Sequence, residues 1–273
     1  MESKPVNTMR VEDFVVLGRT VPEDSRKYGQ KVCMAGYSPS NNQFLRVYPL
    51  MVPVGKSHNA NGFRARHTYA LDLKRNPSDS RTESWRVSEE QKPTTTVWET
   101  AKEIKPDKLR AWLEKRIVPS IRSLDDCRMS IGVLRVAAGR WQGVTVPRES
   151  QIDSEPHRTL FDDLDDQAQL SGDANLISKV KFAPYIHFAD GCAEHKLQVR
   201  EWGAYLLLAK DEYVDRPQML WGASGYRTGR DLYLVIGNMM NHRNNWLIIK
   251  TFEVDPPDTS PSLLDGIEDG QSE

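Results

Sequence analysis

The chain has 273 residues, of which 38% are hydrophobic and 27% charged, and its net charge is −1. This is the composition of a soluble globular protein with enough chain for one large or two modest domains. No segment approaches the roughly 18 apolar residues of a membrane helix, and the N-terminal MESKPVNTMR lacks the apolar region of a signal peptide. We therefore expect a cytoplasmic protein without membrane contact.

The low net charge conceals a segregation of charge along the chain. Residues 149–175 hold eight acidic groups and one basic group, and residues 253–273 hold seven acidic groups and no basic ones. Each segment sums to −7, so the remaining chain carries about +13. A basic body attracts polyanions, nucleic acid first among them. The alternative is that the acidic segments only keep the protein soluble.

In chain order, residues 1–9 read as a flexible leader. Strands are predicted next, by apolar runs and period-two alternation between turn clusters, at residues 11–18, 31–37, 43–49 and 66–75. The runs 31–37 and 43–49 should form an antiparallel hairpin. In FLRVYPL, Phe44, Arg46 and Tyr48 share one face of the strand. Residues 76–87 read as a polar loop, followed by an amphipathic helix over 108–124 that breaks or kinks at Pro119.

RMSIGVLRVAA then reads as a strand that ends the first half, and residues 149–175 read as an acidic linker. The second half repeats this order of elements, with one further strand at its end. A hairpin over 181–199 should turn at Asp190-Gly191. Residues 200–214 read as a helix, with a strand as the alternative. Two strands over 231–239 and 245–254 precede an acidic tail, residues 255–273, which we expect to be disordered.

These elements predict a mainly β protein with two tandem small barrels of the OB type and one or two helices. The first barrel with its helix would span residues 10–148, and the second would span 176–254. A PUA-like or SH3-like barrel fits the strand pattern almost as well.

Several short motifs resemble a family of prokaryotic proteins described as dual OB-containing domain proteins. They are Ser25-Arg26-Lys27, the strand residues Cys33, Ala35 and Gly36, then Arg46 and Pro49, the loop residues Asp79, Arg81, Glu83 and Ser84, and the pair Glu201-Trp202. The resemblance covers most of residues 12–253 and implies two OB folds. Family members are associated with mobile elements and defence loci, which implies a nucleic-acid partner.

Cationic and aromatic residues are interleaved through the first half of the chain. Residues 10–88 hold thirteen basic and seven acidic groups, a surplus of six. Cations that bind phosphates beside rings that stack on bases are typical of single-strand binding. We predict that the following residues bind nucleic acid: Arg19, Ser25, Arg26, Lys27, Tyr28, Arg46, Tyr48, Arg64, Arg66, Lys74, Arg75, Arg81, Trp85, Tyr226, Arg227 and Arg243. The alternative is that these arginines pair with Asp79, Glu83 and nearby acids to brace loops.

Two further groups of residues have weaker chemical readings. Asp72 and Lys74 match one half of a metal-dependent nuclease core, in which a lysine steadies the attacking water. His187, Asp190, Cys192 and His195 are potential zinc ligands, but they lie across a hairpin turn without the usual ligand spacing. Motifs of phosphate-binding loops, dinucleotide folds and esterases are absent from the sequence. We expect neither a metal nor a cofactor.

The sequence therefore predicts a non-catalytic accessory protein that binds single-stranded DNA or RNA in a DNA- or RNA-processing or anti-phage assembly. One alternative is a metal-dependent nuclease or nucleotide-modifying enzyme. The other is a protein-interaction subunit, with the acidic tail as a possible contact for a protein partner.

Overall fold

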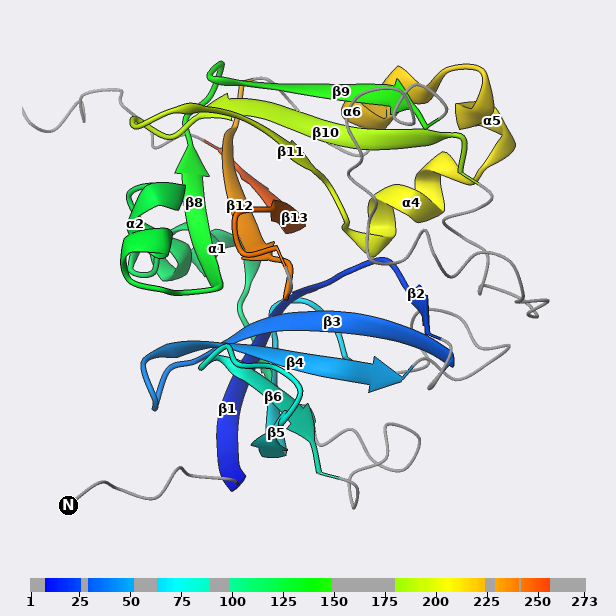
Figure 1. The fold of residues 1–273 in the computed structure, drawn as a ribbon. Helices are drawn as coiled ribbons and strands as arrows, with labels where there is room; N and C mark the ends of the chain where they lie inside the picture. The colour runs from blue at the N-terminus through cyan, green and yellow to red at the C-terminus, as the bar shows by residue number, and fades with distance from the viewer. Residues whose placement is uncertain are drawn as a thin grey trace, which may run out of the picture.

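Strands dominate the structure, a computed structural model that describes residues 8–25, 29–51, 63–88, 99–148, 180–223, 229–240 and 242–255 (Figure 1). The predicted mainly β fold class is confirmed. The strands form two groups, one above the other in Figure 1, with α1 and α2 at one side.

The first group closes into a five-stranded barrel. Its strands are β1 (Thr8–Arg19), β3 (Gly29–Ser38), β4 (Gln43–Met51), β5 (His67–Arg75) and β6 (Ser84–Val87). They follow the order β1-β3-β4-β6-β5, and pairing of β5 with β1 closes the barrel. Only the β4–β6 pair of this ring is parallel. This is the strand arrangement of an OB-type barrel.

Two shorter strands extend the first barrel. β2 (Glu23–Ser25) pairs with β3, and β7 (Glu99–Glu103) pairs with β5. The predicted hairpin of 31–37 with 43–49 is confirmed as β3 and β4. β6 lies in the segment that we predicted to be a polar loop. The prediction missed this strand because its two buried residues, Ser84 and Trp85, are too few to show a period-two pattern.

The second group comprises two three-stranded sheets. One has the order β11-β10-β9 and the other β13-β12-β8. The strands are β8 (Ile131–Val136), β9 (Trp141–Pro147), β10 (Phe182–Ala189), β11 (Glu194–Gln198), β12 (Asp231–Asn238) and β13 (Trp246–Val254). A parallel bridge between Val199 and Ile248 links the sheets, and β8 and β9 follow each other as one bent first strand. The order is therefore again that of an OB-type barrel.

This pairing corrects the predicted grouping of the strands. β8 pairs with β12, and β9 pairs with β10, so residues 131–147 belong with the second barrel and not with the first. Residues 149–175 therefore connect the first two strands of the second barrel and do not separate the two barrels. The sequence missed this because β9 (WQGVTVP) has no clean alternation of apolar and polar residues.

Short helices occupy two places in the chain. α1 (Pro106–Glu114) and α2 (Ile121–Asp126) lie between the two barrels in sequence, and the predicted break near Pro119 is confirmed. The Ser120 side chain caps α2, and Ser123 reciprocates in a capping box. α4 (Trp202–Leu208), α5 (Asp211–Val214), η5 (Pro217–Met219) and α6 (Leu220–Ala223) lie between β11 and β12. Within the described ranges, no helix is long and apolar enough to cross a membrane.

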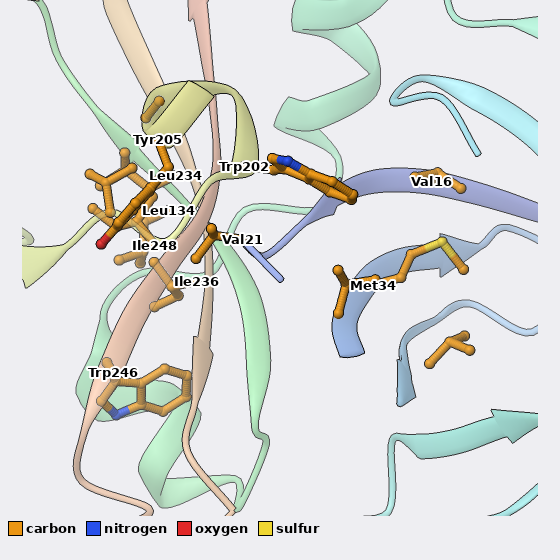
Figure 2. Close-up of a cluster of buried hydrophobic side chains, with 14 of the residues drawn as sticks. Val16, Val21, Met34, Leu134, Trp202, Tyr205, Leu234, Ile236, Trp246 and Ile248 are labelled. Atoms are coloured by element: carbon orange, nitrogen blue, oxygen red, sulfur yellow. The ribbon is translucent and has the colours of Figure 1, made fainter. Parts of the chain in front are cut away.

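Two clusters of buried side chains hold the molecule together. The larger includes Val16 and Met34 of the first barrel and Leu234 and Ile248 of the second, and Figure 2 shows each pair among its own strands. Val21, just after β1, is fully buried and lies beside the second-barrel residues in Figure 2. Its backbone N–H donates to the Arg200 carbonyl at 2.7 Å.

The smaller cluster is a layer shared by both barrels and α1. It joins Ala35, Tyr37 and Phe44 on the outer face of β3–β4 to residues from α1 and from the second barrel; these include Leu109, Leu113, Ile131, Val133, Tyr233, Val235, Ile249 and Phe252. β12 is consequently buried on both faces, which explains its continuous apolar sequence. The outer face of β3–β4, which binds ligands in many OB folds, is covered here.

Candidate nucleic-acid interface

Arg46 is buried between the barrels. Only 5% of its surface is exposed, and its Nη2 donates to the Ser130 carbonyl at 2.7 Å. A Cβ atom at Gly237 would lie 2.6 Å from that Nη2, so the guanidinium fills the space above the glycine. The prediction that Arg46 shares a strand face with Phe44 is confirmed, but its assignment to nucleic-acid binding is wrong, because the second barrel covers that face.

Arg81 is the centre of a second buried contact between the barrels. Its Nε donates to Asp79 Oδ1 at 2.8 Å, and its Nη1 donates to the Asn238 carbonyl at 2.7 Å. Burial alone would raise the pKa of Asp79, but hydrogen bonds from Arg81 and Ser84 and the charge of Arg81 lower it. The prediction that Arg81 binds nucleic acid is therefore wrong, and the alternative that it braces a loop is confirmed.

The Asp79, Arg81, Glu83 and Ser84 motif therefore joins the two barrels. Glu83 accepts the Ser130 backbone N–H at 2.7 Å, while Arg46 binds the carbonyl of the same residue. Both backbone groups of Ser130 thus have side-chain partners from the first barrel. We refer to Arg46, Asp79, Arg81 and Glu83 as the inter-barrel clamp.

Four other predicted binding residues have structural contacts. Arg66 forms an ion pair with Glu103 at 2.9 Å, and Arg243 donates to Ser80 Oγ at 3.2 Å. Trp85 is only 4% exposed, so it cannot stack on a base. The Arg75 guanidinium covers the Trp85 ring at 4.1 Å and donates to the Thr82 carbonyl. The polar loop is braced by its own neighbours.

Five predicted residues lie outside the described part of the chain: Arg26, Lys27, Tyr28, Tyr226 and Arg227. Ser25 is the last residue of β2 and precedes the first three of them directly. Arg64 is exposed, and its side chain forms no ion pair with a described residue. These positions stay predictions.

Of the remaining predicted residues, Lys74 lies on β5, while Arg19 and Tyr48 each form a cation–ring pair with a residue that was not predicted. The Arg19 guanidinium lies 5.1 Å from the Trp202 ring, and Lys31 Nζ lies 5.7 Å from the Tyr48 ring. A β-bridge joins Thr20 to Glu201, and the Arg200 guanidinium lies 5.8 Å from the Tyr205 ring. We call Arg19, Lys31, Tyr48, Arg200 and Trp202 the seam.

Burial shapes the electrostatics of the seam. Desolvation lowers the pKa of Arg19, although a guanidinium remains charged at neutral pH. The carboxylate of Glu201 is occupied, because it accepts Lys250 Nζ, the Thr251 N–H at 3.1 Å and the Thr251 hydroxyl at 2.8 Å. In the chain, Arg19 is the last residue of β1 and Lys31 lies near the start of β3, so the connection between these two barrel strands begins and ends next to members of the seam.

The nuclease alternative lacks the geometry that it needs in the described residues. Asp72 and Lys74 lie on β5, and the Asp72 carboxylate accepts Arg10 Nη1 at 2.8 Å. Arg10 also donates to Glu12, so a guanidinium, and not a metal ion, lies between the carboxylates of Glu12 and Asp72. Within the described ranges, no three His, Cys, Asp or Glu side chains are grouped so that they could hold a metal ion.

Asp190 and His195 of the β10–β11 hairpin have a structural explanation. The Asp190 carboxylate accepts the backbone N–H groups of Ile121, Cys192 and Ala193 and lies 2.9 Å from His195 Nε2. Burial opposes ionisation of Asp190, but these hydrogen bonds and the His195 charge lower its pKa. Asp190 therefore ties the β10–β11 turn to the start of α2.

One surface was missed by the sequence reasoning. A groove of about 430 Å³ runs beside α1, lined by Glu103, Ile104, Lys105, Lys108, Ala111, Trp112, Lys115 and Arg116. We call it the α1 groove. The spacing of Lys105, Lys108 and Lys115, at i, i+3 and i+10, is the signal that could have located this basic helix face.

The strand order and the seam define a protein of two OB-type barrels joined through buried polar contacts, with cations and aromatic rings where β1 ends. A domain family of unknown function, DUF8758, matches residues 10–117, which span the first barrel and α1. No curated protein matches the sequence. The crystal structure of the tetrameric p202 HIN2 is similar at 13% identity and a TM-score of 0.31, over 92% of this chain and 96% of that one.

Proposed function

We propose that the protein is a non-catalytic accessory factor that binds single-stranded DNA or RNA at the seam. The observation that carries this proposal is the pairing of Arg19, the last residue of β1, with Trp202, and of Lys31 on β3 with Tyr48 on β4. In OB folds, the loop between the first two strands is one of the elements that bind oligonucleotides. Arg26, Lys27 and Tyr28 belong to that loop in this sequence.

The seam offers the two interactions that a single strand needs. Base stacking on an aromatic ring contributes about 1–3 kcal/mol per base, and cations add salt-dependent contacts to phosphates. Trp202 is 4% exposed and contributes mainly support, so base stacking would fall to Tyr48, which is half-buried and lies beside Lys31. Because the β3–β4 face is covered, the strand would bind at the barrel's edge and not across its face.

The resemblance to dual OB-containing proteins supports the same ligand class. It also supports a place in a nucleic-acid-processing or anti-phage assembly, with the acidic tail as a contact for a protein partner. Asp72 would need a metal and a second free carboxylate to act in a nuclease, and its contact with Arg10 disfavours that alternative.

The test is fluorescence anisotropy of labelled single-stranded and duplex oligonucleotides over a salt series. The variant that tests this site, called the seam variant, carries Lys31→Gln of the seam together with Arg26→Gln and Lys27→Gln of the connection between β2 and β3. The control variant carries Arg140→Gln, Lys181→Gln and Lys210→Gln, three exposed cations of the second barrel whose side chains form no ion pair with described residues.

For a single strand, the slope of log affinity against log salt is about −0.7 per phosphate contact. We therefore expect the seam variant to lose up to about 2 units of that slope, while the control variant keeps the slope of the unaltered protein. Equal binding by both variants would refute the seam as the site. Shortening of the strand on addition of Mg²⁺ would support the nuclease alternative instead.

A further inference from the structure

The α1 groove has a large local excess of positive charge. Three of its lining residues, Lys105, Lys108 and Lys115, are exposed and form no ion pair with a described residue. Its single acidic lining residue, Glu103, lies 2.9 Å from the Arg66 guanidinium and is therefore neutralised. Exposed lysines clustered on one helix face without acidic partners repel one another, and a bound anion would relieve that repulsion.

One wall of the groove is aromatic and held in place. The Arg116 guanidinium stacks 3.7 Å from the Trp112 ring and 4.5 Å from the Tyr37 ring. Tyr37 also meets Trp112 edge-on at 5.8 Å, and Tyr37 is buried in the layer between the barrels. Trp112 is half-buried and lines the groove, so a rigid indole lies beside the three lysines.

The helix that contains Lys108 and is flanked by Lys105 and Lys115 is fixed to the second barrel. Arg110 donates to the buried Asp231 carboxylate through both Nη atoms, each at 3.0 Å. Arg135 binds the same carboxylate at 2.8 Å, and Leu109 and Leu113 are buried in the layer between the barrels. The opposite side of α1 is therefore occupied by structural contacts, and the groove side is presented in one orientation.

We propose that the α1 groove is a second binding site for single-stranded nucleic acid, distinct from the seam. The choice of single-stranded nucleic acid as the ligand rests on the proposed function. The residues of the α1 groove, however, differ from those of the seam and lie on another part of the molecule. Figure 1 shows α1 on one side of the molecule and β2 and α4, which border the seam, on the other. One chain would then hold two strands, or two parts of one strand.

The dimensions of the groove suit this ligand. At 1.5 Å per residue, Lys105 and Lys115 lie roughly 15 Å apart along the helix axis. One strand of a DNA duplex carries a phosphate about every 3.4 Å along the helix axis, and a more extended single strand would still place at least two phosphates within this length. The groove volume of about 430 Å³ lies in the range of about 300–1,000 Å³ that small-molecule sites occupy, so a base can enter beside Trp112.

The experiment counts binding sites with short single strands. An oligonucleotide of about six nucleotides, near the lower end of the roughly 4–16 that one OB fold occupies, is titrated at low salt by calorimetry and anisotropy. The proteins are the unaltered chain, a groove variant (Lys105→Gln, Lys108→Gln, Lys115→Gln), the seam variant and the control variant. None of the seven described side chains among the nine substituted is buried, and Arg26 and Lys27 fall between β2 and β3 in the sequence, so each protein should fold, and circular dichroism checks this.

We expect two oligonucleotides per unaltered chain and one per groove variant. If the groove variant binds as many oligonucleotides, with the same affinity, as the control variant, the inference is overturned. If the seam variant keeps two and the groove variant falls to one, the groove stands and the seam falls. Polyglutamate serves as a second probe: if it occupies the groove as tightly as the oligonucleotide does, the occupant is an acidic protein segment and the inference is wrong.

Discussion

Replacing Arg81 with glutamine should strongly destabilise the fold without any involvement of nucleic acid. The Arg81 and Asp79 side chains are 5% and 0% exposed, and their ion pair is 2.5 Å long. Removing one partner of a buried ion pair costs about 3–5 kcal/mol, because the other charge stays buried. Ser84 still donates to Asp79 at 2.6 Å in the variant, so we expect a loss near the lower end, about 3 kcal/mol.

Urea denaturation followed by tryptophan fluorescence measures this loss. The free energy of unfolding falls linearly with urea, so the shift in midpoint multiplied by the slope gives the difference between proteins. Arg122→Gln is the matched control, because Arg122 is exposed on α2 and its side chain contacts no described acid. Surface substitutions of this kind change stability by less than about 0.5 kcal/mol.

The pH dependence separates the charge effect from lost packing. In the unaltered protein the pKa of Asp79 is lowered, so its stabilising contribution is full above the unfolded-state pKa of about 3.9 and is lost as pH falls through the folded-state value. In the Arg81→Gln variant, burial without a counter-charge raises that pKa. The stability difference between the two proteins should therefore shrink as the pH is lowered from 7.

Two results would refute this reasoning about the clamp. One is a destabilisation below about 1 kcal/mol at pH 7, the usual size of a single neutral hydrogen bond. The other is a stability difference that does not change with pH. The double variant Asp79→Asn, Arg81→Gln removes both charges and should recover part of the loss, because no unpaired carboxylate remains.

Three further substitutions test contacts elsewhere. Gly237→Ala places a Cβ atom 2.6 Å from Arg46 Nη2, and we expect a loss of about 1–3 kcal/mol from overpacking, measured as a lower urea midpoint. Gly143→Ala places a Cβ atom 2.1 Å from the Trp221 ring, so a changed tryptophan emission should accompany a similar loss; unchanged emission would contradict the contact. Asp231→Asn weakens the anchor of α1 by about 2–3 kcal/mol, and oligonucleotide binding in the α1 groove should fall with it, whereas binding at the seam should not.

The sequence alone predicts local features of this fold well. The alternation in FLRVYPL correctly places Leu45 and Val47 inside the first barrel and Phe44 and Arg46 outside it. The break before Ser120 and the turn at Asp190 also follow from short-range signals. Each of these features depends on backbone preference or on the side-chain period within about ten residues.

The exposure of a strand face is set by contacts that are distant in sequence. Arg46 looks like a binding residue in the sequence because alternation places it outside the barrel. Its carbonyl partner, Ser130, is 84 residues away, and the Asn238 carbonyl that binds Arg81 is 157 residues away. No periodicity within a strand indicates that a second barrel will cover it, and the same limit explains the wrong grouping of β8 and β9.

The sequence indicated the kinds of residue in the candidate site, cations and aromatic rings, but not which of them lie where a ligand could bind. The surplus of cations and rings in residues 10–88 is real, but several of its members are used to join the barrels. Lys105, Lys108 and Lys115, in and beside α1, do not take part in joining the barrels. Lysines are mostly exposed in any protein, so their spacing alone indicates only a solvated helix face. The lining of the groove and the missing ion pairs distinguish it, and both require coordinates.

The position of the acidic segment within the second barrel makes this barrel divisible. Pro147 pairs with Phe182, and the Arg148 N–H donates to the Lys181 carbonyl at 3.0 Å, so the ends of the segment are held side by side. Proteolytic cleavage within the segment would leave β8 and β9 on one fragment and β10 and β12 on the other, still hydrogen-bonded to each other. The two fragments should therefore co-elute as one particle, and separately expressed halves should reassemble through these strands.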